Sequence, residues 1–522
     1  MNDATLMSEV LNGWPHPPAY RTMIDPIHGL VRLTDEEMAV VSHPLFQRLR
    51  RIRQNGLLYL VFHGATHNRF EHSIGVCHLA QEMLDAAWMN TQTAAKKGAL
   101  GPRSRAKGAR EPAVDITSVS PEVLAMVARI TRLAALCHDL GHGPLSHTFD
   151  SFALTPSDLG PRIAEAASLR SIRAAFPSIL GHTESVRGAD GSSIKRVSHE
   201  SMSCLFAAEI LFDLSASGVI PTKDATLLAR AITVVLIPKS AGAAPNWISV
   251  RLAPWLGVAR DIVSGAPVDA DRMDYLERDS RACGVSYGLF DRNRVLKSLL
   301  ICRTKGNVRP VLRIGIKKSG IPAIENFVQA RFELFRQVYH HKTNAAISSM
   351  LEELAANRPA DPPVIAARTW PDLRRFYENL SDESFIDGLR NDKHRPTRKI
   401  AEQLFLRRLW KRVADLPSQT SADRMIRKLV RRFPRQGLLV RSSIPTKPTK
   451  GLDKQGGVIL ERDPDGAYCV HRASRWTDIR VSAIINALHS DSLVLHRLFY
   501  AEHDPKHLKS LKQAVASFTG RV

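Results

Sequence analysis

The stretch that decides the fold is Leu133-Ala-Ala-Leu-Cys-His-Asp-Leu-Gly-His-Gly-Pro-Leu-Ser-His147. Its apolar first part predicts a buried helix, and Gly141 and Gly143 are typical of the turn that follows a helix. The helix would therefore end at the adjacent pair His138 and Asp139. Because neighbouring residues on a helix point about 100° apart, both side chains reach one target only in a special arrangement. A cation that binds one imidazole and one carboxylate would be such a target.

Two distant segments carry side chains that would complete a metal site. Residues 67–72 (HNRFEH) open an apolar run upstream, and residues 268–276 (VDADRMDYL) lie downstream. With the central pair they supply two imidazoles and two carboxylates, a set that suits Mn, Fe, Co, Ni or Zn, or Mg through its oxygen ligands. We therefore expect a divalent metal, with four ligands: His72, His138, Asp139 and Asp271. The alternative is that both histidines are packed core residues.

With these segments in view, the chain resembles a known family, the HD-domain phosphohydrolases. Within that family it is most similar to the deoxynucleoside triphosphate (dNTP) triphosphohydrolases of the SAM-and-HD-domain type. The resemblance covers roughly residues 20–345 and continues weakly to about 415. The matching stretches are residues 25–29 (DPIHG), 44–54, 67–76, 138–150, 199–200, 269–284 and 327–344. The resemblance implies a mainly α fold, with an HD-domain helical core and small β elements. Beyond it, residues 456–498 mix strand-like pieces with an apolar helix and predict a C-terminal α+β extension.

The 522 residues are enough for one large core or for two to three domains. Inside the core we expect two exposed insertions, at about 91–118 and 181–197, because both are rich in small and charged residues. The apolar stripe from Phe327 to Val338 predicts one long helix over 324–354. The expected organisation is an N-terminal arm (1–20), an HD phosphohydrolase core (21–345), a basic helical region (346–440) and the C-terminal extension (441–522).

The chain is strongly basic, with Lys and Arg exceeding acidic residues by 73 − 51 = 22. Such an excess favours anionic partners. Residues 393–450 hold 17 basic and 3 acidic residues, a net of 17 − 3 = +14, so nucleic acid is a further partner expected there. No apolar run reaches the roughly 18 to 20 residues of a membrane helix, and the start lacks a signal-peptide pattern. We therefore expect a cytoplasmic protein without a membrane partner.

Further histidines follow the His-Asp pair, and imidazole is the side chain best matched to proton transfer at neutral pH. By resemblance, His199 is the general acid, and Glu200, or a nearby carboxylate such as Asp150, orients it. The resemblance also implies that His142 and His147 contact phosphate or the reacting water. For His142, the alternative is that it only satisfies the turn.

The resemblance implies a set of substrate-binding side chains as well. The phosphates would be bound by cations, and the deoxyribose and base by polar and aromatic groups. For the two tyrosines, core packing is the alternative. The set comprises Arg69 and Lys342 at the phosphates with Arg331 nearby, Gln54, Tyr275 and Asp279 at the sugar, and Tyr339 beside the base.

Taken together, the resemblance implies a metal-dependent dNTP triphosphohydrolase. It would cleave dNTP to deoxynucleoside and triphosphate by attack of metal-activated water on the α-phosphorus, in a homo-oligomer. Two alternatives stay open: an HD-type nuclease or phosphodiesterase acting on single-stranded nucleic acid or other nucleotides, and a non-catalytic nucleic-acid-binding regulator. Ser42 stands where nucleotide-activated members carry an acidic residue, so we do not expect GTP activation to carry over unchanged.

Overall fold

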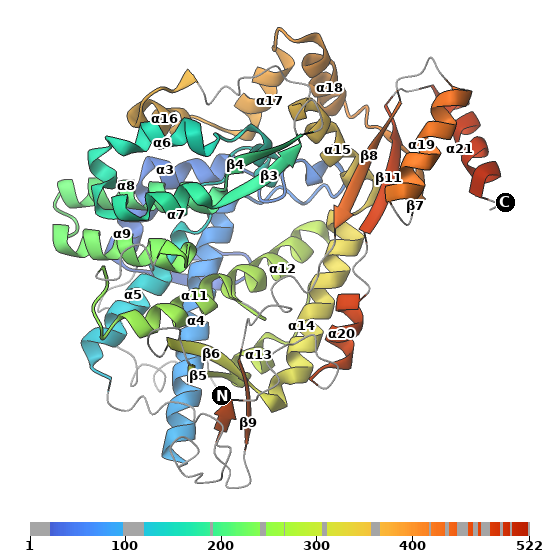
Figure 1. Ribbon diagram of the computed structural model, residues 1–522. Coiled ribbons are helices and arrows are strands. Elements are labelled where there is room, and N and C mark those ends of the chain that lie inside the picture. The colour runs from blue at the N-terminus through green and yellow to red at the C-terminus, as the bar shows by residue number, and fades with distance from the viewer. Residues whose placement is uncertain are drawn as a thin grey trace.

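The computed structural model describes most of the chain, and all structural statements concern that part. The described residues are 21–97, 119–187, 192–240, 247–265, 267–304, 311–356, 366–416, 419–433, 438–445, 458–462, 468–470, 481–490, 494–501 and 504–519. They form mainly helices with a few small sheets (Figure 1), which confirms the predicted fold class.

The helices and strands divide into a long helical part and a C-terminal part that mixes both. The α-helices are α2 (Asp35–Ser42), α3 (Pro44–Gln47), α4 (Arg69–Lys96), α5 (Pro121–Cys137), α6 (Pro156–Ala164), α7 (Phe176–Gly181), α8 (His199–Ala216), α9 (Thr222–Leu236), α11 (Leu256–Ser264), α12 (Ala270–Cys283), α13 (Arg292–Ser298), α14 (Ile321–Leu334), α15 (Lys342–Ala356), α16 (Trp370–Glu378), α17 (Asp382–Arg390), α18 (Arg395–Phe405), α19 (Gln419–Arg432), α20 (Ala483–Ser490) and α21 (Pro505–Thr519). The strands are β1 (Arg21–Asp25), β2 (Gly29–Leu33), β3 (Thr183–Arg187), β4 (Ser193–Val197), β5 (Leu299–Thr304), β6 (Val311–Lys317), β7 (Lys411–Leu416), β8 (Leu438–Pro445), β9 (Val458–Arg462), β10 (Tyr468–Val470) and β11 (Val494–Tyr500).

Helix α4 runs through the helical core and packs against α5 and α12 (Figure 1). It begins at an Asn68 cap, whose side chain accepts a hydrogen bond from the backbone N–H of Glu71. Gly75 lies where α12 comes closest, because a Cβ atom there would overlap the carboxylate of Asp274. The glycine therefore lets two helices that carry polar site residues approach each other.

The turn after α5 is fixed by side chains from other elements. Ser203 on α8 donates a hydrogen bond to the carbonyl oxygen of His138 (2.6 Å) and accepts one from the N–H of Gly141 (2.8 Å). The fully buried Arg48 donates to the carbonyls of Leu140 and His142. These bonds satisfy carbonyl groups that the end of a helix leaves without partners.

Helix α12 is capped at both ends. The Asp269 side chain caps it by accepting from the N–H of Arg272 (2.8 Å), and Gly284 ends it with a φ of 68°. The cap places Asp271 in the first turn, with its side chain facing α4 and α5.

The two predicted insertions contain regular structure and stay predictions. In the first, helix α4 continues to Lys96. Its residue Thr91 is buried, and the Thr91 hydroxyl donates to the carbonyl of Ala87 and accepts from the N–H of Ile301 in β5. Residues 98–118 of the first insertion lie outside the described residues. In the second, strands β3 and β4 pair as an antiparallel hairpin, and residues 188–191 lie outside the described residues.

The single long helix predicted over 324–354 is wrong. Helix α14 ends at Leu334, a π-helical turn covers Phe335–Tyr339, and α15 begins at Lys342. The apolar period continues across this break, so it carries no sign of the interruption. The side chain of Asn344 stabilises the break by donating to the carbonyl of Tyr339 (2.8 Å).

The C-terminal part contains helices and strands, as predicted. Strands β7, β11 and β8 form one sheet, and α19 and α21 pack with it around a hydrophobic cluster separate from the main core. Strand β9 instead pairs parallel with β6 of the core. The predicted domain boundaries stay predictions. Within the described residues, no helix combines the length and apolar character that crossing a bilayer requires.

Candidate metal and phosphate site

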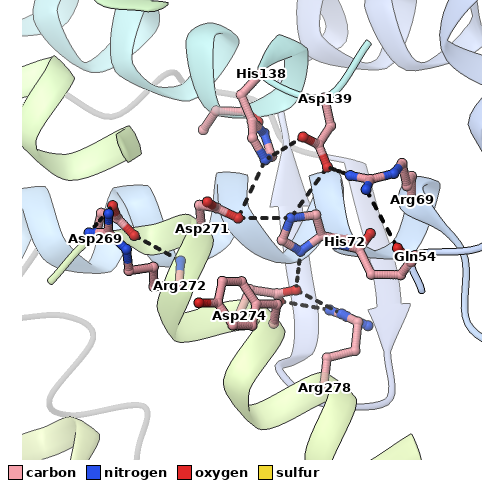
Figure 2. A network of polar contacts seen from close by, with 12 residues as sticks. Gln54, Arg69, His72, His138, Asp139, Asp269, Asp271, Arg272, Asp274 and Arg278 are labelled. Atoms are coloured by element: carbon pink, nitrogen blue, oxygen red, sulfur yellow. Dashed lines mark hydrogen bonds and ion pairs between the residues drawn. The ribbon is translucent and has the colours of Figure 1, made fainter. Parts of the chain in front are cut away.

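Four side chains from three segments meet at one point (Figure 2). His72 lies on α4, His138 and Asp139 directly follow α5, and Asp271 lies on α12. The Nε2 atom of His72 is 3.2 Å from Asp271 Oδ1 and 3.6 Å from Asp139 Oδ2. The Nε2 atom of His138 is 3.3 Å from Asp139 Oδ1 and 3.7 Å from Asp271 Oδ1. The four predicted ligands therefore lie together.

The electrostatics of this cluster fit a cation. Both Nε2 atoms are buried and make no hydrogen bond of good geometry within the described residues. Burial alone would lower the pKa of His72, but Asp271 and Asp274 raise it to about 10. The neighbouring carboxylates therefore favour a positive charge at His72. Two imidazole nitrogens and carboxylate oxygens are suitable ligands for a divalent metal ion.

Arg69 lies beside this cluster, at the start of α4. Its guanidinium is buried and forms an ion pair with Asp139. It also donates to the Ser146 hydroxyl at 2.9 Å. Burial alone would raise the pKa of Asp139, but Arg69 and the two imidazoles hold it below its usual range. Gln54 is close to Arg69 (Figure 2), and its Oε1 atom is buried without a hydrogen-bond partner among the described residues.

Three further predicted histidines form a second cluster next to the first. The rings of His142 and His199 stack at 3.7 Å between centroids, and His147 meets both rings edge-on at 4.9 and 5.3 Å. His142 Nε2 is 3.5 Å from Asp139 Oδ1, which links the two clusters. The His147 side chain is 72% exposed, so the second cluster opens to solvent.

The two carboxylates considered as partners for His199 lie by different histidines. Glu200 Oε2 is 3.4 Å from His199 Nδ1, whereas Asp150 Oδ2 is 3.5 Å from His147 Nδ1. Burial lowers the pKa of His199, and the Glu200 carboxylate opposes that shift. Of the two carboxylates, Glu200 is therefore the one adjacent to the His199 ring.

The residues expected around a sugar and base form their own network. The Tyr275 hydroxyl accepts a hydrogen bond from Arg331 Nε at 3.0 Å. Asp279 accepts from His67 Nε2 at 2.6 Å and from the Tyr339 hydroxyl. Lys342 is exposed at the start of α15, and no described polar contact joins its side chain to either histidine cluster.

Sequence reasoning missed the residues behind His72. Asp274 accepts from His72 Nδ1 at 2.7 Å, and it also contacts His28 and Arg278. Two signals were present: Asp274 lies three residues after Asp271 on the same helix face, and His28 belongs to the DPIHG stretch.

The zebrafish protein "Deoxynucleoside triphosphate triphosphohydrolase SAMHD1" is 27% identical over 420 residues, which cover 78% of this chain and 57% of the relative. The uncharacterised protein YwfO of Bacillus subtilis is 28% identical over 334 residues, covering 63% of this chain and 54% of YwfO. No family model matches.

A solved structure of a phosphohydrolase from Bacteroides thetaiotaomicron superposes with a TM-score of 0.56. It is 20% identical, and the match covers 93% of this chain and 100% of that chain. The resemblance to the HD-domain phosphohydrolases is confirmed. The chain spans about half the length of the curated relatives it matches.

Proposed function

We propose that this protein is a metal-dependent hydrolase that cleaves dNTP to deoxynucleoside and triphosphate. The observation that carries the proposal is the convergence of His72, His138, Asp139 and Asp271, with two buried imidazole nitrogens that lack hydrogen-bond partners among the described residues. Similarity to SAMHD1 proteins over more than three quarters of the chain supports the choice of dNTP as substrate.

These four residues would hold the divalent cation, which could be Mn, Mg, Fe, Co, Ni or Zn. When bound, such a cation withdraws charge from a phosphate oxygen and makes water more acidic. Arg69 is already adjacent to Asp139 and would bind a non-bridging phosphate oxygen, with Lys342 and Arg331 supplying further positive charge. Water attacks the α-phosphorus, and the bond from phosphorus to the 5′-oxygen breaks.

The 5′-oxygen needs a proton as it leaves, and the second histidine cluster would supply it. His199 would be the donor, with Glu200 at 3.4 Å orienting its ring. Burial favours neutral His199 in the free protein, whereas a bound triphosphate would favour the protonated ring through its negative charge. His142 and His147 would contact phosphate or the attacking water.

The neighbouring hydrogen-bond network would select the sugar. Asp279 would accept from the 3′-hydroxyl, with His67 holding its carboxylate in place. Tyr275 would pack where a 2′-hydroxyl would collide, Gln54 would assist at the sugar, and Tyr339 would flank the base. Because the Tyr339 hydroxyl already bonds Asp279, sugar and base recognition would share one carboxylate.

A nucleotide panel tests the proposal. Each dNTP is incubated with the protein and Mn²⁺ or Mg²⁺, with and without other nucleotides as activators, and products are separated by chromatography. We expect deoxynucleoside and triphosphate. Asp139→Ala should abolish turnover while far-UV circular dichroism stays unchanged, and Asp387→Ala, an exposed aspartate on α17, should remain active. Intact dNTP under every condition would refute the proposal.

A second candidate function has one specific observation in its favour. Five basic residues lie exposed on one face of α19, at helical spacings of three and four: Arg424, Arg427, Lys428, Arg431 and Arg432. Over about 12 Å, such a stripe matches a run of phosphates on a nucleic-acid strand. We propose that a nucleic acid binds there, either as a substrate of an HD-type nuclease or phosphodiesterase or as the ligand of a non-catalytic regulator.

Binding and cleavage of a labelled oligonucleotide separate these versions. We expect fluorescence anisotropy to report binding that weakens with salt, and the Arg427→Glu/Arg431→Glu variant to lower the slope of log K against log salt by about one unit per lost contact. Arg170→Glu, at an exposed site elsewhere, is the charge control. Degradation of the strand identifies a nuclease. Unchanged binding by the α19 variant would exclude this surface.

We also propose a homo-oligomer, on the resemblance alone. Sedimentation equilibrium checks this, and a particle of one chain at all protein concentrations would contradict it.

A further inference from the structure

Asp274 is the centre of a buried hydrogen-bond network directly behind His72 (Figure 2). Its Oδ1 accepts from His28 Nε2 (2.6 Å) and Arg278 Nη2 (2.9 Å). Its Oδ2 accepts from His72 Nδ1 (2.7 Å) and Arg278 Nε (2.8 Å). The side chains of His28, His72 and Asp274 are all 0% exposed. A carboxylate that accepts four hydrogen bonds away from water is held in a single position.

The donor and the acceptor of each hydrogen bond in this network can be assigned one after another. Arg292 Nη1 is 3.2 Å from His28 Nδ1, and a guanidinium can only donate. His28 Nδ1 therefore accepts, and in a neutral ring the proton is on Nε2, which donates to Asp274. Since an ionised carboxylate can only accept, His72 Nδ1 must donate as well. In a neutral His72, the free lone pair is then on Nε2, the atom that faces Asp271 and Asp139.

The polar side chains of the turn at residues 25–29 are both engaged in this network. Asp25 Oδ1 accepts from the backbone N–H groups of Ile27 (2.8 Å) and His28 (2.9 Å), which shapes the turn. Asp25 Oδ2 pairs with Arg278 at 3.0 Å. The turn thus reaches α12 twice, through His28 to Asp274 and through Asp25 to Arg278.

We propose that the turn at residues 25–29 is the outer support of the metal centre, with His28 and Asp274 as positioning residues for His72. Neither residue touches the cation or a substrate. They set which nitrogen of His72 is free and where that nitrogen points. The inference rests on the proposed function, because it requires His72 to be a metal ligand.

Loss of the His28 donor has a defined consequence. Asp274 Oδ1 would keep only its bond from Arg278, and the carboxylate would be free to rotate toward the guanidinium. His72 would then lose its fixed partner. Mutation of a residue that hydrogen-bonds to a metal ligand typically lowers metal affinity by about 10- to 100-fold. The cost should therefore appear in cation binding as well as in turnover.

Two amide variants test the hydrogen bond that His28 Nε2 donates to Asp274. In His28→Gln the side-chain amide reaches about the position of Nε2 and can donate to Asp274, whereas in His28→Asn it reaches only the position of Nδ1. His78→Asn is the control, because His78 stacks on His28 (ring centroids 5.2 Å apart) and pairs with Glu82 but has no described contact with Asp274.

The experiment uses the full chain after removal of metal with a chelator. Mn²⁺ binding is measured by calorimetry at fixed pH, and Co²⁺ absorption reports the ligand geometry. We expect His28→Asn to weaken Mn²⁺ binding about 10- to 100-fold and to alter the Co²⁺ spectrum. His28→Gln should recover most of the affinity, and His78→Asn should bind as the unmodified protein does.

The outcomes separate this inference from the proposed function. If the unmodified protein binds neither Mn²⁺ nor Co²⁺, the proposed function fails first. If it binds both, and His28→Asn binds them equally well, only the role of the turn is refuted. A lower melting temperature of His28→Asn in chelator, with unchanged Mn²⁺ affinity, would show a purely structural role and also refute it. Should His28→Asn not fold, Arg292→Gln, which removes the donor to His28 Nδ1, takes its place under the same criteria.

Discussion

Gly141 has no room for a side chain, because a Cβ atom there would overlap the carbonyl oxygen of His199 and lie 2.6 Å from the N–H nitrogen of Ser203. This close contact brings the turn after α5 against the start of α8, so that the rings of His142 and His199 stack. The glycine therefore sets the geometry of the second histidine cluster.

Gly141→Ala should separate the turn from α8. We expect a loss of about 1–3 kcal/mol in the free energy of unfolding, from overpacking, measured by urea denaturation, together with a fall in kcat. Gly388→Ala is the control, since its Cβ would meet nothing within 4 Å on the exposed face of α17. It should instead stabilise the protein by up to about 1 kcal/mol. Equal stability of Gly141→Ala and the unmodified protein would contradict the close contact.

Asp85 on α4 makes stability depend on pH. Burial raises the pKa of its carboxyl to about 7, against the opposing effects of Gln81 and Arg132 and with a smaller contribution from Glu82. In the unfolded chain an aspartate titrates near pH 3.9. Between about pH 4 and 7 the unfolded chain has released a proton that the folded chain keeps, so stability falls as pH rises through this window.

Asp85→Asn removes this titration and keeps an oxygen that can accept from Gln81 Nε2. We expect the variant to be more stable than the unmodified protein by about 1–3 kcal/mol at pH 8, with the difference vanishing near pH 4. Urea midpoints at pH 4, 6 and 8 measure it. The same difference in stability between the two proteins at all three pH values would show that the Asp85 carboxyl is ionised in the folded protein.

Elements differed in how well the sequence predicted them, for physical reasons. The end of α5 was predictable because an apolar run meets two glycines. The end of α4 was not, because Thr91 is polar in sequence and buried only through hydrogen bonds to Ala87 and to Ile301, some 200 residues away. The β3–β4 hairpin was missed because its strands are short, polar and paired only with each other.

Tyr339 is the last residue of the π-helical turn at Phe335–Tyr339, and its hydroxyl donates a hydrogen bond to Asp279 on α12. Such turns are frequent at functional sites. Tyr339→Phe would leave Asp279 with His67 as its remaining described donor, and the carboxylate would lose one constraint.

We expect Tyr339→Phe to raise KM for the nucleotide several-fold with little change in kcat, because the hydroxyl is distant from the reacting phosphorus in the proposed mechanism. Steady-state kinetics with Mn²⁺ measure the effects on KM and kcat separately. Tyr59→Phe, on a ring that packs under Arg53, is the control. A fall in kcat without a change in KM would place Tyr339 in the chemical step instead.

At the scale of the whole molecule, the site depends on contacts that no local pattern contains. The sequence and its family resemblance predicted which residues would converge, and His72, His138 and Asp271 do lie together. His28 and Asp274 are 246 positions apart, and an imidazole near one end of the chain gives no sign of which of many carboxylates it will meet. The residues behind the proposed metal ligands could therefore be identified only in the folded structure.

The C-terminal sheet has its own apolar cluster, in which Leu429 of α19 is 0% exposed and packs with Leu498 and Leu511. Because this cluster is separate from the main core, damage to it should stay local. Leu429→Ala should destabilise the cluster by about 2–5 kcal/mol. Amide hydrogen exchange should therefore rise in α19, β7 and β11 and stay unchanged in α4 and α5, and Mn²⁺ affinity should be retained.

Leu205→Ala is the reciprocal test, because Leu205 of α8 is equally buried but belongs to the main core. It should raise exchange in α8 and its neighbours and leave the amides of β7 and β11 protected. If either variant raises exchange uniformly over the chain, the two clusters unfold as one cooperative unit. In that case the C-terminal part would contribute to the stability of the metal centre, and removing it would weaken cation binding.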